Sequence, residues 1–195
     1  TWSRSGPNMG IRTTERKNSM DFYTLVQRRE SCRQYEDRPV EPEKIDQMLA
    51  CARLAPSACN SQPWHFTVVA GEKARQIAPY MKEHGLNGFA EQVPCFLVIQ
   101  ETKAQLAPAV AGLVDSQKYA QMDVGIVTAF LTLAAAEMGL GTCILGSFSE
   151  EKIREALDIP PERKVRLILC VGYPDGGDAP RPKKRKELSE IAEIL

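Results

Sequence analysis

The spacing of apolar residues along the chain predicts three principal helices. The segment "MDFYTLVQRR", residues 20–29, opens the first, and "EPEKIDQMLACARLA", residues 41–55, gives the second, with Pro42 at a favourable first-turn position. The third runs from about Ser116 to Met138 and is apolar on every side from Ile126 onwards. We expect such a helix to be covered on more than one side, by the core and by a second subunit.

Four shorter runs are predicted as strands. They are "FTVVA" at 66–70, "PCFLVIQ" at 94–100, "GTCILG" at 141–146 and "KVRLILCVGYP" at 164–174, with shorter helical segments at 71–84 and 149–157. The apolar residues in "CFLVI" and "RLILCVG" are continuous rather than alternating, which is typical of strands with helices on both faces. The pattern therefore predicts a central covered sheet of the α+β or α/β class.

Length and composition fit a globular protein with one core. The chain has 195 residues, 43% of them hydrophobic, and we expect one domain over residues 20–195. Residues 1–19 are polar and irregular and lack the apolar core of a signal peptide, so they are interpreted as a flexible arm or an expression remnant.

Charge and cysteine content exclude several function classes. Basic and acidic residues number 25 each, so no overall field attracts nucleic acid or an anionic membrane. The six cysteines form no C-x-x-C motif and no metal-ligand spacing with the two histidines, so a metal site is not expected. Several lie inside apolar runs, which indicates reduced thiols and a cytoplasmic protein.

The most apolar stretch, Val124 to Gly146, is interpreted as a buried helix followed by a strand. Glu137 and a glycine-rich break interrupt it before the roughly 18 to 20 uninterrupted apolar residues that a membrane span needs. No membrane partner is expected.

Two basic segments stand far apart along the chain. If the residues after the first helix are extended, Arg29, Ser31 and Arg33 share one face, and two guanidiniums beside a hydroxyl suit a phosphate. The alternative is a solvated loop whose cations pair with nearby acids. The second segment is "RPKKRK", residues 181–186, which is either a solvated tail, a nucleic-acid contact, or a source of cations for a shared anion.

The stretch "APSACNSQPWHF", residues 55–66, is neither helix nor strand by pattern. It is a capped turn leading into a strand, or a loop kept for its short polar side chains and exposed backbone groups.

Five segments, in this order and spacing, resemble the FMN-dependent nitroreductase family. They are "RRESCRQYEDRPV", "LACARLAPSACNSQPWHFTVV", "DVGIVTAFLTLAAAEMGLGTCILGSFSEEKIREALDIP", "VRLILCVGYP" and "KKRK". The resemblance runs from about Asp21 to the C-terminus. It implies an α+β fold with a mixed, mainly antiparallel sheet covered by helices on both faces, and an intertwined homodimer with FMN at the subunit interface.

The same resemblance implies the cofactor-binding residues. From one subunit they are Arg29, Glu30, Ser31 and Arg33, the strand-end segment Cys143, Ile144, Leu145 and Gly146 beside the flavin ring, and the tail pair Lys183 and Arg185 at the phosphate; from the other subunit they are Pro56, Ser57, Ala58 and Asn60. No residue is assigned as a general acid or base, because the flavin carries the redox chemistry.

The implied function is that of an FMN oxidoreductase. It would pass electrons from NAD(P)H, its co-substrate, to a nitroaromatic compound, a quinone or a similar small acceptor by a ping-pong mechanism. Two alternatives stay open: a flavin-binding sensor or carrier without NAD(P)H turnover, and an interaction domain with a basic tail.

Overall fold

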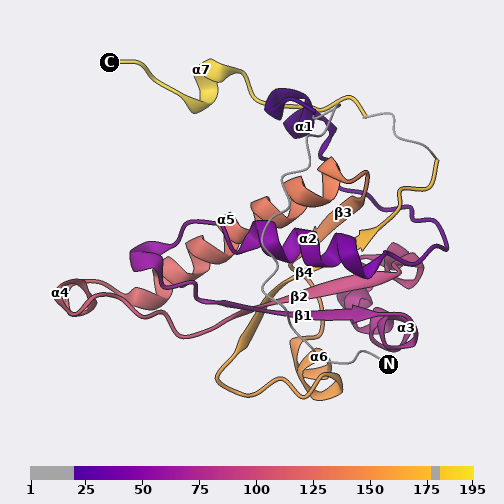
Figure 1. Cartoon of the computed structure of the whole chain (residues 1–195), viewed down its shortest axis with the longest axis horizontal. Helices are drawn as coiled ribbons and strands as arrows, with labels where there is room; N and C mark the ends of the chain where they lie inside the picture. Colours follow the sequence, from indigo (N-terminus) through magenta and orange to yellow (C-terminus); the bar gives the residue numbers. More distant parts are fainter. Residues whose placement is uncertain (1–19, 177–180) are drawn as a thin grey trace.

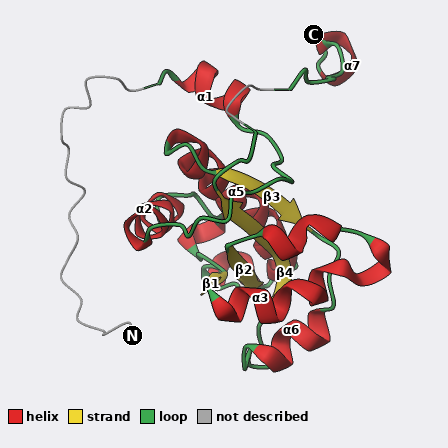
Figure 2. Ribbon diagram, turned by 90° about the vertical axis from the view of Figure 1, so that its right-hand side faces the viewer, coloured by secondary structure: helices red, strands yellow, loops and turns green. Residues whose placement is uncertain are grey.

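In the computed structural model, which describes residues 20–176 and 181–195, a four-stranded sheet lies between two helical layers (Figure 2). The strands are β1 (Trp64–Ala70), β2 (Cys95–Glu101), β3 (Gly141–Leu145) and β4 (Lys164–Gly172), in the order β1-β2-β4-β3. Neighbouring strands are antiparallel throughout, and a single parallel bridge, Ser31 to Thr142, joins the outer side of β3. The predicted α+β class, with a mainly antiparallel sheet, is confirmed.

Helices cover both faces of the sheet, as the continuous apolar strands predicted. One face packs against α2 (Pro42–Ala52) and α5 (Ser116–Glu137). The other packs against α3 (Glu72–Ile77), α6 (Glu150–Ala156) and the 3-10 segments Ala78–Gly85 and Gly88–Gln92. All seven residues of β2 are buried, because this central strand lies under both layers.

The remaining helices are short and lie at the periphery. They are α1 (Phe22–Arg28), the 3-10 turn Ala58–Asn60, α4 (Pro108–Ala111) and α7 (Leu188–Ile191). In Figure 1 the indigo α1 and the yellow tail segment lie together at one end of the molecule, beyond the sheet. The predicted arm at 1–19 lies outside the described residues.

The long helix α5 carries the core on one face. Val124, Val127 and Leu131 are buried against the sheet and α2. In the described part of the chain, α5 is the one helix long and apolar enough to cross a membrane by length and composition, and its position in the core accounts for that composition. On another face Tyr119, Met122 and Ile126 are exposed.

Gly172, at the end of β4, leaves no room for a side chain. A Cβ atom there would lie 2.7 Å from Cδ1 of Tyr35 and 2.8 Å from ring atoms of Pro94. We expect Gly172→Ala to lower the free energy of unfolding by about 1 to 3 kcal/mol, because Tyr35 is buried and must shift. Chemical denaturation would measure it. Gly88→Ala, whose Cβ meets nothing within 4 Å, is the control, and equal losses in the two variants would contradict the steric explanation.

Candidate functional site

The segment that follows α1 runs along the outer side of β3. Ser31 pairs with Thr142 in a parallel bridge, and the Cys32 N–H donates to the Thr142 carbonyl oxygen at 2.8 Å. Further on, Tyr35 bridges to Pro174. The backbone here is therefore held against the sheet, and Ser31 lies beside the residue that precedes Cys143.

The C-terminal tail returns to the same place. The Arg181 backbone N–H and Nε donate to the two carboxylate oxygens of Glu30, at 3.2 and 3.1 Å, and Nη2 donates to the Ser31 carbonyl oxygen. Two segments about 150 residues apart in the chain are thereby joined. The basic run that begins at Lys183 follows two residues after this contact.

Lys183 has an ammonium group that lacks a partner within the described residues. Its Nζ is inaccessible to solvent and makes no hydrogen bond. The pKa of Lys183 is lowered, chiefly by desolvation. The guanidiniums of Arg29 and Arg185 lower it further, whereas the carboxylate of Glu30 raises it. Two guanidiniums thus act on the buried Lys183 ammonium, and the three cations form a cluster. Such a cluster is costly unless an anion joins it, and a phosphate group fits these donors.

Strand β3 borders the segment that carries Arg29 and Arg33. Cys143 is buried, which raises the pKa of its thiol, and the charge of Arg33 partly opposes that rise, so Arg33 is close enough to act on Cys143. Ile144 is 45% exposed, whereas Leu145 is buried. A Cβ at Gly146 would meet nothing within 4 Å, so the backbone there is open to a bound group.

The loop before β1 has an unusual backbone. Three residues have positive φ values, which residues other than glycine rarely adopt: Cys59 at 50°, Asn60 at 53° and Gln62 at 47°. The Gln62 N–H donates to Oγ of Ser57 at 2.9 Å. Strain of this kind persists where surrounding contacts impose it, and it is common at binding loops.

Asp123 of α5 holds the first residue of the 3-10 turn in this loop. Both of its carboxylate oxygens accept the Ala58 N–H, at 3.3 and 3.2 Å, and the side chain is buried. Sequence reasoning missed this residue. The available signal was a lone carboxylate inside an apolar helix, which needs a polar partner when it is buried.

The loop and the cation cluster lie at opposite corners of the sheet in one chain. β1 and β3 are the two edge strands, and Trp64 aligns through Glu101 with Lys164, the first residue of β4, whereas Thr142 aligns with Val171 near its end. Strand spacing puts the corners about 14 Å apart across the sheet and about 23 Å apart along it. Pro56, Ser57, Ala58 and Asn60 therefore do not join the other predicted residues within one chain.

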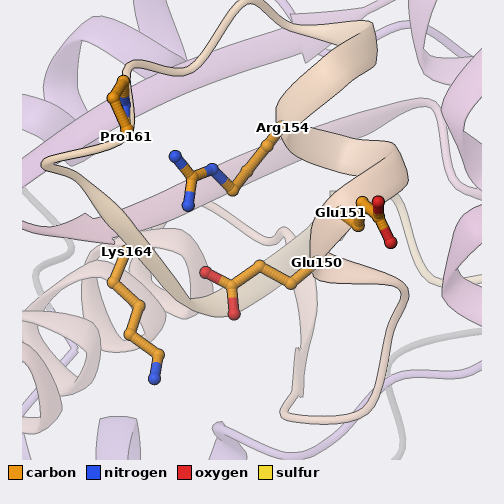
Figure 3. A pocket seen from close by; sticks show the side chains of 5 residues that line it. All are labelled: Glu150, Glu151, Arg154, Pro161 and Lys164. Atoms are coloured by element: carbon orange, nitrogen blue, oxygen red, sulfur yellow. The ribbon is translucent and has the colours of Figure 1, made fainter.

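A separate polar hollow of about 530 Å³ lies beside α6 (Figure 3). Glu150, Glu151, Arg154, Pro161 and Lys164 line it. One Glu150 oxygen already accepts the Val165 N–H at 3.1 Å. None of the predicted cofactor residues lines this hollow, and it adjoins the first residue of β4, far from the cation cluster.

Comparison with known proteins identifies relatives over most of the chain. The family model described as "Nitroreductase family" matches residues 26–173. An Archaeoglobus fulgidus protein provisionally named NADH dehydrogenase/NAD(P)H nitroreductase is 33% identical over 158 residues, covering 77% of this chain and 83% of its own. A Thermotoga neapolitana protein named iodotyrosine deiodinase is 30% identical over 174 residues, covering 83% and 91%.

A solved structure gives the same result at the level of the fold. A provisionally named nitroreductase from Exiguobacterium sibiricum, crystallised in complex with FMN, superposes with a TM-score of 0.78 at 26% identity. The alignment covers 92% of this chain and 99% of that one.

Proposed function

Because the chain belongs to the nitroreductase family of oxidoreductases, we propose that it binds FMN and transfers electrons from NAD(P)H to a nitroaromatic compound, a quinone or a similar acceptor in a ping-pong cycle. The single observation that carries the cofactor assignment is the buried Nζ of Lys183, which has no hydrogen-bond partner in the part of the chain that the structure describes and feels the charges of Arg29 and Arg185. A phosphate group of FMN would supply the missing negative charge.

Six of the predicted residues have a stated part in this proposal. Arg29, Lys183 and Arg185 would hold the phosphate, Ser31 and Arg33 would lie along the ribityl chain, and the open backbone at Gly146 would admit the ring. When bound, FMN supplies the hydride and electron transfer chemistry, and the protein supplies its binding, orientation and electrostatic environment. A positive group at the pyrimidine edge of the ring stabilises the reduced, anionic flavin, and Arg33 is the candidate.

A homodimer would complete the site. The loop at Pro56 to Asn60 lies at the opposite corner of its own sheet, so it can meet the cation cluster of a second copy. Exposed apolar side chains support that arrangement: Phe22 and Tyr23 are each 71% exposed and Met122 is 63% exposed. A cytoplasmic location agrees with the six free cysteines and belongs to the same proposal.

An absorption spectrum tests the proposal directly. We expect purified protein to be yellow, or to become yellow with added FMN, and to be bleached by NADH or NADPH under anaerobic conditions. A nitroaromatic compound or a quinone should then restore the colour. Protein that stays colourless with FMN contradicts the cofactor assignment, and yellow protein that neither NADH nor NADPH bleaches supports a flavin carrier or sensor instead.

Reductive removal of halogen from an aromatic ring is a second candidate. The observation that favours it is the 30% identity with the protein named iodotyrosine deiodinase. Iodide release from iodotyrosine by the dithionite-reduced protein would support this candidate, and turnover of nitro compounds without iodide release would favour the first.

A further inference from the structure

The carboxylate of Glu30 lies among cations that are expected to hold a phosphate, where a negative charge should weaken binding. Among the described residues, neither of its oxygens accepts a hydrogen bond from Lys183 or Arg29. They accept the backbone N–H and Nε of Arg181 instead, at 3.2 and 3.1 Å. The Glu30 side chain is 28% exposed and the Arg181 side chain 57% exposed, so the contact lies at the surface where it can open.

Arg181 makes a third contact with the same segment. Its Nη2 donates to the Ser31 carbonyl oxygen, so one side chain joins two consecutive residues of the segment that borders β3. Pro182 follows and restricts the backbone, and Lys183 comes next with its ammonium inside the cation cluster. Because only Pro182, with its restricted φ, separates the two residues, fixing Arg181 limits the positions that Lys183 can take.

We propose that Glu30 and Arg181 form a latch that holds the C-terminal tail over the phosphate end of the cofactor site, and that opening this latch limits the release of FMN. The inference rests on the proposed function for its cofactor, whereas the latch itself rests on the contacts of the tail. Glu30 is then a positioning residue, in place of the direct cofactor contact that the sequence resemblance implied. Its negative charge is tolerated at an anion site because Arg181 is paired with it.

The direction in which Glu30→Gln changes FMN affinity distinguishes a latch from a carboxylate that only repels the phosphate. Removing a carboxylate that only repels the phosphate should tighten FMN binding, whereas opening a latch should weaken it. For Glu30→Gln we expect FMN to dissociate about tenfold faster, with a smaller change in the association rate. Stopped-flow quenching of flavin fluorescence on mixing FMN with apo-protein gives the association rate, and recovery of fluorescence on release gives the dissociation rate. Glu36→Gln removes the same charge from the exposed part of this segment and is the matched control.

A charge exchange tests the pairing itself. Arg181→Glu should accelerate FMN release about as much as Glu30→Gln, and the exchanged variant Glu30→Arg with Arg181→Glu should release FMN more slowly than either Arg181→Glu or Glu30→Arg alone. Tighter FMN binding by Glu30→Gln, or a failure of the exchange to slow release, would overturn the latch.

The latch can also be measured without flavin, which separates its failure from failure of the proposed function. Trypsin cleaves after the basic residues 183–186, and in apo-protein we expect Glu30→Gln to be cut there several-fold faster than wild type or Glu36→Gln. If wild-type protein binds no FMN but this difference is present, the cofactor assignment is wrong and the latch stands. If FMN binds and the three proteins are cut at equal rates, the latch is wrong.

Discussion

Replacing Lys183 with methionine is expected to weaken FMN binding by about 10- to 150-fold without lowering the stability of the apo-protein. A charge-assisted hydrogen bond from a partly desolvated ammonium to phosphate contributes about 1.5 to 3 kcal/mol, which corresponds to that range of affinity. The Nζ of this ammonium is inaccessible to solvent and has no hydrogen-bond partner among the described residues, and the charges of Arg29 and Arg185 lower the pKa of Lys183. Methionine keeps the length and apolar stem of the side chain and removes the charge.

The two effects of Lys183→Met have opposite origins, and they are measured separately. Titration of FMN into apo-protein, followed by quenching of flavin fluorescence, gives the dissociation constant. Thermal unfolding of the apo-protein gives its stability, which should be equal to or above that of wild type. Lys184→Met removes a neighbouring, exposed lysine and should change neither quantity by much. Equal FMN affinity in the two variants would contradict the assignment of the FMN phosphate to this cluster.

The sequence predicted the elements whose pattern is long or continuous. Helix α5 was expected from Ser116 to Met138 and ends at Glu137, and all four strands lie within two residues of their predicted starts. The short α4 and α7 were not anticipated, because four residues are too few for a periodic pattern. The family resemblance was confirmed by the family model and the relatives.

The candidate site was predictable in its composition but not in its geometry. The alternation of Arg29, Ser31 and Arg33 and the basic tail are visible in the sequence, since charge pattern needs no tertiary information. The burial of the Lys183 ammonium is not visible, because the tail that carries it meets the first basic segment through a contact between Arg181 and Glu30, about 150 residues apart in the chain. The hydrogen bond between Ala58 and Asp123 likewise joins residues that are 65 positions apart in the sequence. Such contacts arise from the fold and leave little local signature.

A second large effect is expected at the other end of the sheet, where Glu101 is buried at the end of β2. Only 4% of its side chain is exposed, and Nε of Arg166, on β4, donates to one of its oxygens. Nε2 of Gln117, at the start of α5, donates to the other oxygen and to the Thr102 carbonyl oxygen, the latter at 3.0 Å. This carboxylate therefore joins the central strand, its neighbour and the long helix.

Replacing Arg166 with methionine should leave that carboxylate charged and without its cation. Removing one partner of a buried ion pair lowers the free energy of unfolding by about 3 to 5 kcal/mol. Because 26% of the Arg166 side chain is exposed, water can reach the vacated position, and we expect a loss of about 2 to 4 kcal/mol. At about 2 to 4 °C per kcal/mol for a chain of this size, the melting temperature should fall by roughly 5 to 15 °C. Differential scanning calorimetry measures it.

Two further variants identify the cause of the loss. Arg75→Met breaks the pair with Glu72, whose side chains are 66% and 69% exposed, and should change stability by no more than about 0.5 kcal/mol because exposed pairs are screened by water. Adding Glu101→Gln to Arg166→Met removes the uncompensated charge and keeps an acceptor for Gln117, so it should recover much of the lost stability. A loss in Arg166→Met as small as that in Arg75→Met would mean that water, rather than Arg166, compensates the charge of Glu101.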